Sequence, residues 1–64
     1  MVNECPNIPS TAVYNPSEAA IILGVSRQTI YNAMESGALR HRFTRDGYRR
    51  IVGAWIKMYW NRKN

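Results

Sequence analysis

Arginine side chains cluster in the middle of this 64-residue chain, where they could bind a polyanion. Six of the nine lysine and arginine residues fall between positions 27 and 50, and all six are arginine. A guanidinium presents a planar fork of N–H donors that fits a phosphate group or the O6/N7 edge of guanine. The net charge of +5 favours nucleic acid first and an anionic membrane second. The six residues are Arg27, Arg40, Arg42, Arg45, Arg49 and Arg50.

Other polar residues surround Arg27 at the expected start of a helix. The hydroxyl of Ser26 is expected to cap this helix, which begins one residue later. The first turn of a helix lying in the major groove places its side chains at base edges. Gln28 can bond an adenine through N6 and N7, and Arg27 can bond a guanine or a phosphate. For Asn32 and Thr29 an ordinary surface position is the alternative to a phosphate or sugar contact. We use the name reading residues for all predicted contacts of this helix with a nucleic acid, whether to base edges, phosphate or sugar: Ser26, Arg27, Gln28, Thr29, Tyr31 and Asn32.

The residues on either side of Ser26 predict a pair of helices joined by a short turn. Asn15 is a good N-cap, Pro16 suits the first helical position, and Glu18 completes a capping-box spacing. Gly24 should end the first helix in a left-handed conformation, and Gly37 should end the second. A turn of about three residues is typical of a helix-turn-helix corner. Apolar residues expected to face the core are Ala19, Ala20, Ile22, Leu23, Ile30, Ala33 and Met34.

The stretch after the second helix predicts two strands around a glycine turn. A two-residue loop ending at Gly47 would place Phe43 and Ile51 on opposite faces of the hairpin. A three-residue loop with Gly47 left-handed pairs Thr44 with Tyr48 and places both apolar side chains on one face. Because a one-residue slip exchanges the two faces, burial of Phe43 and Ile51 favours the three-residue loop.

In this register the hairpin has two chemically different faces. The underside is expected to be apolar and to contain Leu39, His41, Phe43 and Ile51. The predicted wing contacts are Arg40, Arg42, Thr44, Arg45 and Arg50. They should follow the phosphate backbone or enter a neighbouring minor groove, where narrow A·T tracts attract arginine, with Arg45 at the tip the best candidate. Arg49 shares a face with Phe43 and is expected to lie along the core edge. Glu35 would repel phosphate and is expected to stay off a nucleic acid.

The C-terminal third predicts an amphipathic helix from Val52 to Trp60. Positions 52, 55, 56, 59 and 60 are apolar and follow helical spacing. The side chains of Trp55, Ile56 and Tyr59 should close the core. Trp60 should lie near the rim of the core as a candidate protein contact. Residues 61–64 are expected to form a basic tail, in which Arg62 and Lys63 are further candidate protein contacts.

The N-terminal residues 1–11 carry two prolines and no periodicity, which predicts an irregular arm. The short apolar run at residues 12–14 is either a brief strand or packing beneath the first helix. Ile21 points away from the apolar stripe of its helix. It is expected either to be covered by the arm or to contact another protomer.

Cysteine, histidine and carboxylate positions do not support a metal site or an enzyme. The single Cys5 has no partner for a disulfide, and one cysteine with His41 cannot make a zinc site. His41 is expected to be a packed histidine at the core edge. The four carboxylates are scattered, and no catalytic arrangement is visible. We therefore expect one small non-enzymatic domain with no metal and no cofactor.

The chain also lacks the patterns of export and membrane insertion. The N-terminal residues have no basic region or apolar segment of a signal peptide. The longest apolar run, from Ile51 to Trp60, is too short to span a bilayer and contains Lys57. We expect a cytoplasmic protein, associated with the nucleoid or, if phage-encoded, in the host cytoplasm, without a membrane partner. The alternative to nucleic-acid binding is a module that docks on a membrane surface or on another protein through the helix at 52–60.

Together these residues resemble a known family. The matching pattern is Ser17-Glu18-Ala19-Ala20-x-x-Leu23-Gly24-Val25-Ser26-Arg27-x-Thr29-Ile30-Tyr31, then Gly37-x-Leu39, a basic glycine-turn hairpin and a helix containing Trp55. It resembles the excisionase-like, MerR-type winged helix domains over roughly residues 13 to 60. The fold expected for residues 12–60 is mainly α with a small β-hairpin wing, a winged helix-turn-helix.

The resemblance implies double-stranded DNA as the ligand. MerR regulators carry a long dimerisation helix and an effector domain after such a unit, and these 64 residues contain neither. On that basis we expect an excisionase, or recombination directionality factor, of a phage or mobile element. Such a protein binds repeated sites cooperatively through protomer–protomer contacts, bends DNA and directs an integrase toward excision. A small phage-type transcriptional regulator that binds an operator is the alternative.

Overall fold

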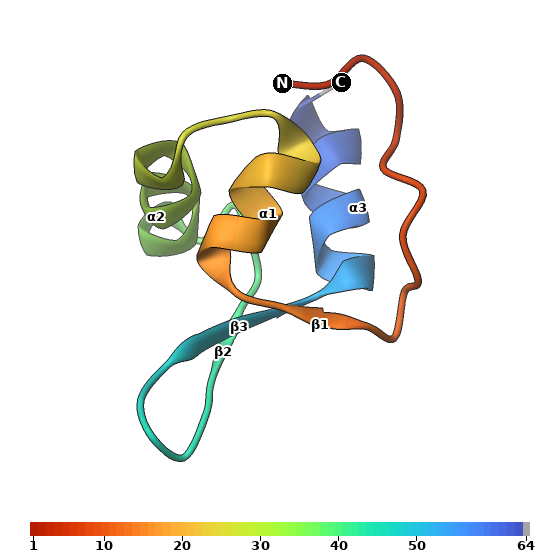
Figure 1. Ribbon diagram of the computed structural model, residues 1–64. Coiled ribbons are helices and arrows are strands. Elements are labelled where there is room, and N and C mark those ends of the chain that lie inside the picture. The colour runs from red at the N-terminus through yellow and green to blue at the C-terminus, as the bar shows by residue number, and fades with distance from the viewer. Residues whose placement is uncertain (64) are drawn as a thin grey trace.

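The computed structural model describes residues 1–63, with the side chain of Lys63 and all of residue 64 left outside the description. Over that range the chain forms three helices and a three-stranded sheet, shown in Figure 1. Their order is β1 (Val13–Tyr14), α1 (Pro16–Leu23), α2 (Arg27–Ser36), β2 (Arg42–Phe43), β3 (Arg49–Val52) and α3 (Gly53–Lys63). The expected winged helix-turn-helix is confirmed.

Local hydrogen bonds set the ends of α1 and α2 where the sequence predicts them. The Asn15 side chain accepts from the Glu18 backbone N–H at 2.8 Å, and the Glu18 carboxylate accepts from the Asn15 N–H at 3.1 Å. Gly24, with φ +69°, ends α1, and Gly37, with φ +83°, ends α2. Ser26 caps α2 by accepting from the Thr29 backbone N–H at 3.2 Å. The predicted helix pair is therefore confirmed.

Removing the first cap should weaken the domain measurably. Asn15→Ala leaves the Glu18 N–H of α1 without its side-chain partner and should lower the free energy of unfolding by about 1 kcal/mol. Urea denaturation followed by tryptophan fluorescence measures this change. Asn7→Ala, at an exposed position of the N-terminal arm, is the control and should leave the midpoint unchanged. Equal midpoints for the two variants would contradict the role of the capping box.

The sheet has the strand order β1-β3-β2 and is antiparallel throughout. Arg42 lies opposite Arg50 and Phe43 opposite Arg49. Beyond them the Thr44 N–H donates to the Tyr48 carbonyl at 2.8 Å, and Gly47 turns the chain with φ +87°. The three-residue loop is therefore confirmed. The run at residues 12–14 contributes β1, which pairs with β3 through Val13↔Val52 and Tyr14↔Ile51.

The core lies between the three helices and the inner end of the sheet. Its fully buried large side chains are Leu23, Ile30, Leu39, Ile51 and Ile56. Figure 1 shows that the β2–β3 hairpin projects beyond the helices. Phe43, expected to be buried on its underside, is 60% exposed. Phe43 does lie on the same face of the hairpin as Ile51, as the register requires. The expected burial was wrong because the core ends before the hairpin reaches Phe43.

The third helix begins at Gly53, one residue later than expected, because Val52 belongs to β3. The strand passes directly into the helix, and Val52, the residue before Gly53, has no polar side chain that could cap it. Instead the N–H groups of Gly53 and Ala54 donate to the carbonyls of Ala12 at 2.8 Å and Ser10 at 3.1 Å. A β-carbon at Gly53 would overlap the carbonyl oxygen of Pro9. The helix runs on to Lys63, so residues 61–63, expected in a tail, form its last turn.

The N-terminal arm is irregular but fixed to the body near its start at Val2, as well as through the Ser10 and Ala12 carbonyls. The Val2 N–H donates to the Leu23 carbonyl at 2.9 Å, and the Val2 carbonyl accepts from the Trp60 indole N–H at 3.0 Å. Figure 1 shows the arm running along α3. The arm therefore covers Trp60, which is half-buried, and leaves Ile21 80% exposed. The alternative in which the arm covers Ile21 is wrong.

Candidate nucleic-acid interface

The exposed face of the α2 N-terminus carries the predicted reading residues. Arg27, Gln28 and Tyr31 are all exposed, as are Thr29 and Asn32. The Gln28 side-chain N–H donates to the Asn32 side-chain oxygen at 3.0 Å, one helical turn further on. This bond orients the Gln28 carboxamide. Ser26 lies at the cap, where its hydroxyl also contacts that of Thr29 at 3.0 Å.

The outer face of the hairpin carries several of the predicted wing residues. Arg42 and Arg50 are a directly opposed cross-strand pair, and Thr44 lies further along the same face. Two like charges facing each other across a ladder destabilise a hairpin. A bound polyanion would remove that repulsion. Arg50 lies over the Tyr48 ring at 5.7 Å, and Arg45 is exposed in the loop at the tip.

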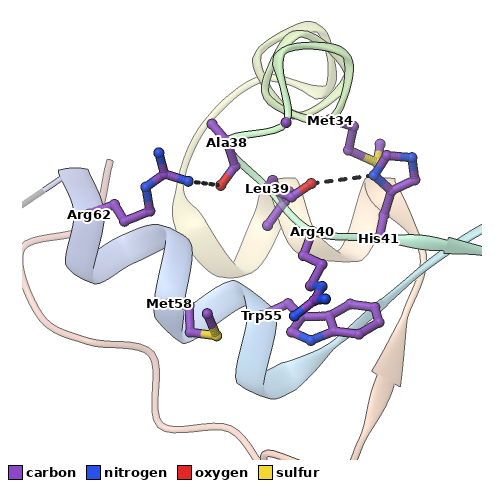
Figure 2. Close-up of a pocket in the computed structure, with 9 residues that line it drawn as sticks. Met34, Ala38, Leu39, Arg40, His41, Trp55, Met58 and Arg62 are labelled. Atoms are coloured by element: carbon purple, nitrogen blue, oxygen red, sulfur yellow. Dashed lines mark hydrogen bonds between the residues drawn. The ribbon is translucent and has the colours of Figure 1, made fainter.

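Arg40 and Arg62 lie apart from the other predicted contacts, in a groove beside α3. Figure 2 shows Arg40 against the Trp55 ring, with the guanidinium 5.8 Å from the ring centre. The Arg62 guanidinium donates to the Ala38 carbonyl at 3.2 Å. Met58 completes the wall of this groove, whose volume is about 360 Å³. Arg40 is thus at the base of the hairpin and faces α3 rather than the outer face.

The inner face of the hairpin contacts α2 through Arg49. The Arg49 guanidinium donates to the Glu35 carboxylate at 3.2 Å and lies 5.2 Å from the centre of the Tyr31 ring. It also lies 5.7 Å from the ring of Phe43. Arg49 therefore joins the hairpin to the helix instead of lying along the core edge as expected. Phe43 is further fixed by an edge-on contact with the His41 ring at 5.5 Å.

Sequence reasoning missed two residues of this region. Phe43 was assigned to the core, although it is exposed and lies against Arg49, which also contacts the Tyr31 ring. The contact between Glu35 and Arg49 was also missed. A usable signal was present, because Glu35 is the one acid of α2 and Arg49 lies on the hairpin face that looks toward that helix.

Affinity for a nucleic acid should depend strongly on salt. If the reading and wing residues neutralise about four to six phosphates, log affinity should fall against log salt with a slope of about −4 to −5. Fluorescence anisotropy with a labelled duplex between low and moderate salt measures the slope. Flat affinity across that range would contradict an interface built on these arginines.

Among residues 1–63, no three histidine, cysteine or acidic side chains come together in a way that could hold a metal ion. In the same part of the chain no helix has the length and apolar character needed to cross a membrane.

Comparison with known proteins identifies the family to which this geometry belongs. The family model described as "Helix-turn-helix domain" matches residues 13–63, which include every helix and strand. No curated protein and no solved structure matches the chain. The matched range covers the capped helix pair and the arginine-bearing hairpin together. The chain therefore belongs to the helix-turn-helix domain family, and its function is sequence-specific DNA binding.

Proposed function

We propose that this DNA-binding domain acts as an excisionase of a phage or mobile element. In this proposal it binds repeated sites cooperatively, bends the DNA and directs an integrase toward excision. The observation that carries the proposal is the projecting hairpin, which extends the DNA-binding surface well beyond α2 (Figure 1). A protein with contacts in two neighbouring grooves can recover the energy of bending DNA through the additional contacts.

The wing supplies chemistry suited to a deformed duplex. Arg42, Arg45 and Arg50 offer cations for phosphates or for a narrowed minor groove. Phe43 and Tyr48 are 60% and 63% exposed, and they lie on opposite faces of the hairpin. Aromatic side chains beside a groove can pack on sugars or wedge between base steps. This combination favours an architectural role over simple reading of a single groove.

Cooperative binding requires a surface between neighbouring protomers. Ile21 is a large apolar side chain, 80% exposed on α1. Ile21 lies on α1, which is beside α2 in the helix pair. In this proposal the Ile21 side chain contacts the wing or the arm of a protomer bound to the next repeat. For the integrase contact we retain Arg62 at the end of α3, together with Lys63, whose side chain lies outside the described residues. Trp60 is a weaker candidate because the arm already covers it.

Footprinting and a purified recombination reaction test the proposal. We expect tandem protected segments within an attachment site, with a bend detected by circular-permutation gel shifts. We also expect stimulation of excision when a purified integrase from the same phage or mobile element is added. Arg27→Ala, which removes a reading residue, is the matched variant that should need a higher protein concentration to protect the site and should stimulate excision less at equal concentration.

A transcriptional role is the competing outcome of the same experiments. A small regulator would protect one operator overlapping a promoter and would leave the integrase reaction unchanged. DNA binding without any effect on excision would therefore defeat the excisionase proposal while leaving the DNA-binding function intact.

A further inference from the structure

Arg49 differs from Arg42 and Arg45 of the hairpin in burial and in partners. Its side chain is 26% exposed, whereas Arg42 and Arg45 are exposed. Its Nη2 atom is committed to the Glu35 carboxylate, and its Nη1 atom is buried without a hydrogen-bond partner in the described structure. A phosphate approaching from outside would not reach the buried Nη1, and at Nη2 it would have to displace the Glu35 carboxylate. Arg49 is therefore poorly placed to be a DNA ligand.

The same side chain connects the two DNA-binding elements. The guanidinium lies between Tyr31 of α2, at 5.2 Å, and Phe43 of β2, at 5.7 Å. The ion pair with Glu35 adds a second connection to α2, fourteen positions away in the chain. The main packing of α2 is against α1, while β3 packs on β1, α1 and α3. The Arg49 contacts thus span a junction where the recognition helix and the wing meet outside the core.

We propose that Arg49 is a positioning residue that fixes the wing relative to the recognition helix. Glu35 holds the guanidinium in place, and the two aromatic rings set its plane. This inference rests on DNA binding through α2 and the wing. If Arg49 holds the two elements rigidly, the protein should be specific for the distance between the DNA segment bound by α2 and the segment bound by the wing. Two rigidly joined elements can occupy their grooves together only when these segments are one set distance apart.

The first test uses the DNA-free protein. Arg49→Met keeps a long apolar stem but removes the charge and the fork. We expect residual dipolar couplings to show residues 42–50 reoriented or averaged relative to residues 27–36, and 15N relaxation to show a more mobile hairpin. Unchanged amide shifts in α1 and α3 would show that the variant is folded. An unchanged hairpin orientation and mobility would overturn the proposal without reference to any DNA.

The second test uses duplexes selected from a random-sequence pool. The wild-type protein should select one spacing between the block read by α2 and the block bound by the wing. Arg49→Met should accept additional spacings. Its affinity for the best wild-type duplex should fall about threefold to tenfold, as expected when a loosened junction must be ordered on binding. The slope of log affinity against log salt should stay unchanged, because no phosphate contact is lost.

Two further variants separate positioning from phosphate binding. Arg42→Met is the matched control on the same hairpin; it should reduce the salt slope by about 0.9 and keep the single spacing. Arg49→Lys retains the charge but not the planar fork, so it should not restore the spacing preference. Two results would instead assign Arg49 to phosphate binding. One is a single spacing preference in Arg49→Lys. The other is an Arg49→Met protein that keeps the single spacing but whose slope of log affinity against log salt is reduced by about 0.9. If the wild-type protein selects no duplex, the DNA-binding premise fails, and the measurements on the free protein still decide whether Arg49 positions the wing.

Discussion

Replacing Gly53 with alanine should lower the free energy of unfolding by about 2–3 kcal/mol, the range of an overpacked interior. The added β-carbon would overlap the Pro9 carbonyl oxygen, which is backbone and cannot rotate away. The arm would have to move, and the bonds from Gly53 and Ala54 to the carbonyls of Ala12 and Ser10 would weaken with it. On helix propensity alone the same change would stabilise α3 by about 0.5–1 kcal/mol, so the two explanations differ in sign.

Urea denaturation with tryptophan fluorescence distinguishes the two signs. Gly37→Ala is the matched control, since Gly37 has φ +83° but open space where the β-carbon would go. Its conformational strain alone should destabilise by about 1–2 kcal/mol. The indole N–H resonance of Trp60 should shift in Gly53→Ala and stay in place in Gly37→Ala, because only the first change displaces the arm. A more stable Gly53→Ala protein would mean that the arm does not occupy this position.

Replacing Arg27 with alanine should weaken binding to the best selected duplex by about 5- to 150-fold, equivalent to ~1–3 kcal/mol for a good base contact. Arg27 is exposed in the first turn of α2, immediately after the Ser26 cap. A side chain there reaches base edges when the helix N-terminus enters the major groove. The preference at one base pair should be lost at the same time. Fluorescence anisotropy at fixed salt, with duplexes differing at single positions, measures both effects.

Arg45→Ala is the companion variant for this experiment. Arg45 is exposed at the tip of the wing and is expected to contact phosphate or the minor groove. Its loss should weaken binding to all duplexes similarly and reduce the salt slope by about 0.9. If Arg27→Ala gives that uniform pattern instead, Arg27 binds the backbone, and base reading must be assigned to Gln28 and Tyr31.

Capping residues and turn glycines made the helix pair and the hairpin turn predictable. Asn15 and Ser26 act on N–H groups three residues away, and Gly24 and Gly47 turn the chain at their own positions. Such signals are complete within a short window of sequence, so tertiary packing had little opportunity to override them. The register was predicted from the expected burial of Phe43 and Ile51 on one face; Ile51 is buried there, and Phe43 is not.

Long-range features were not predictable in the same way. The carbonyls of Ser10 and Ala12 cap α3, and backbone groups leave no signature in the residue types around them. Gly53 was the one available clue, because a glycine in the first turn of a helix can mark a close approach of another chain segment. Phe43 was misplaced for a related reason. The register of a hairpin shows which face a side chain lies on, but it does not show how far the hydrophobic core extends beneath that face.

The bond between Val2 and Trp60 joins residues 58 positions apart and has a consequence for how the domain folds. Closing so large a loop costs conformational entropy that grows with the logarithm of its length. Contacts between distant segments also form slowly relative to helix turns and hairpins. The arm should therefore dock last, onto an α1 and α3 that are already packed. During synthesis, a nascent chain whose third helix is still inside the ribosome lacks the Trp60 indole that binds Val2, so the domain completes its fold only after Trp60 emerges.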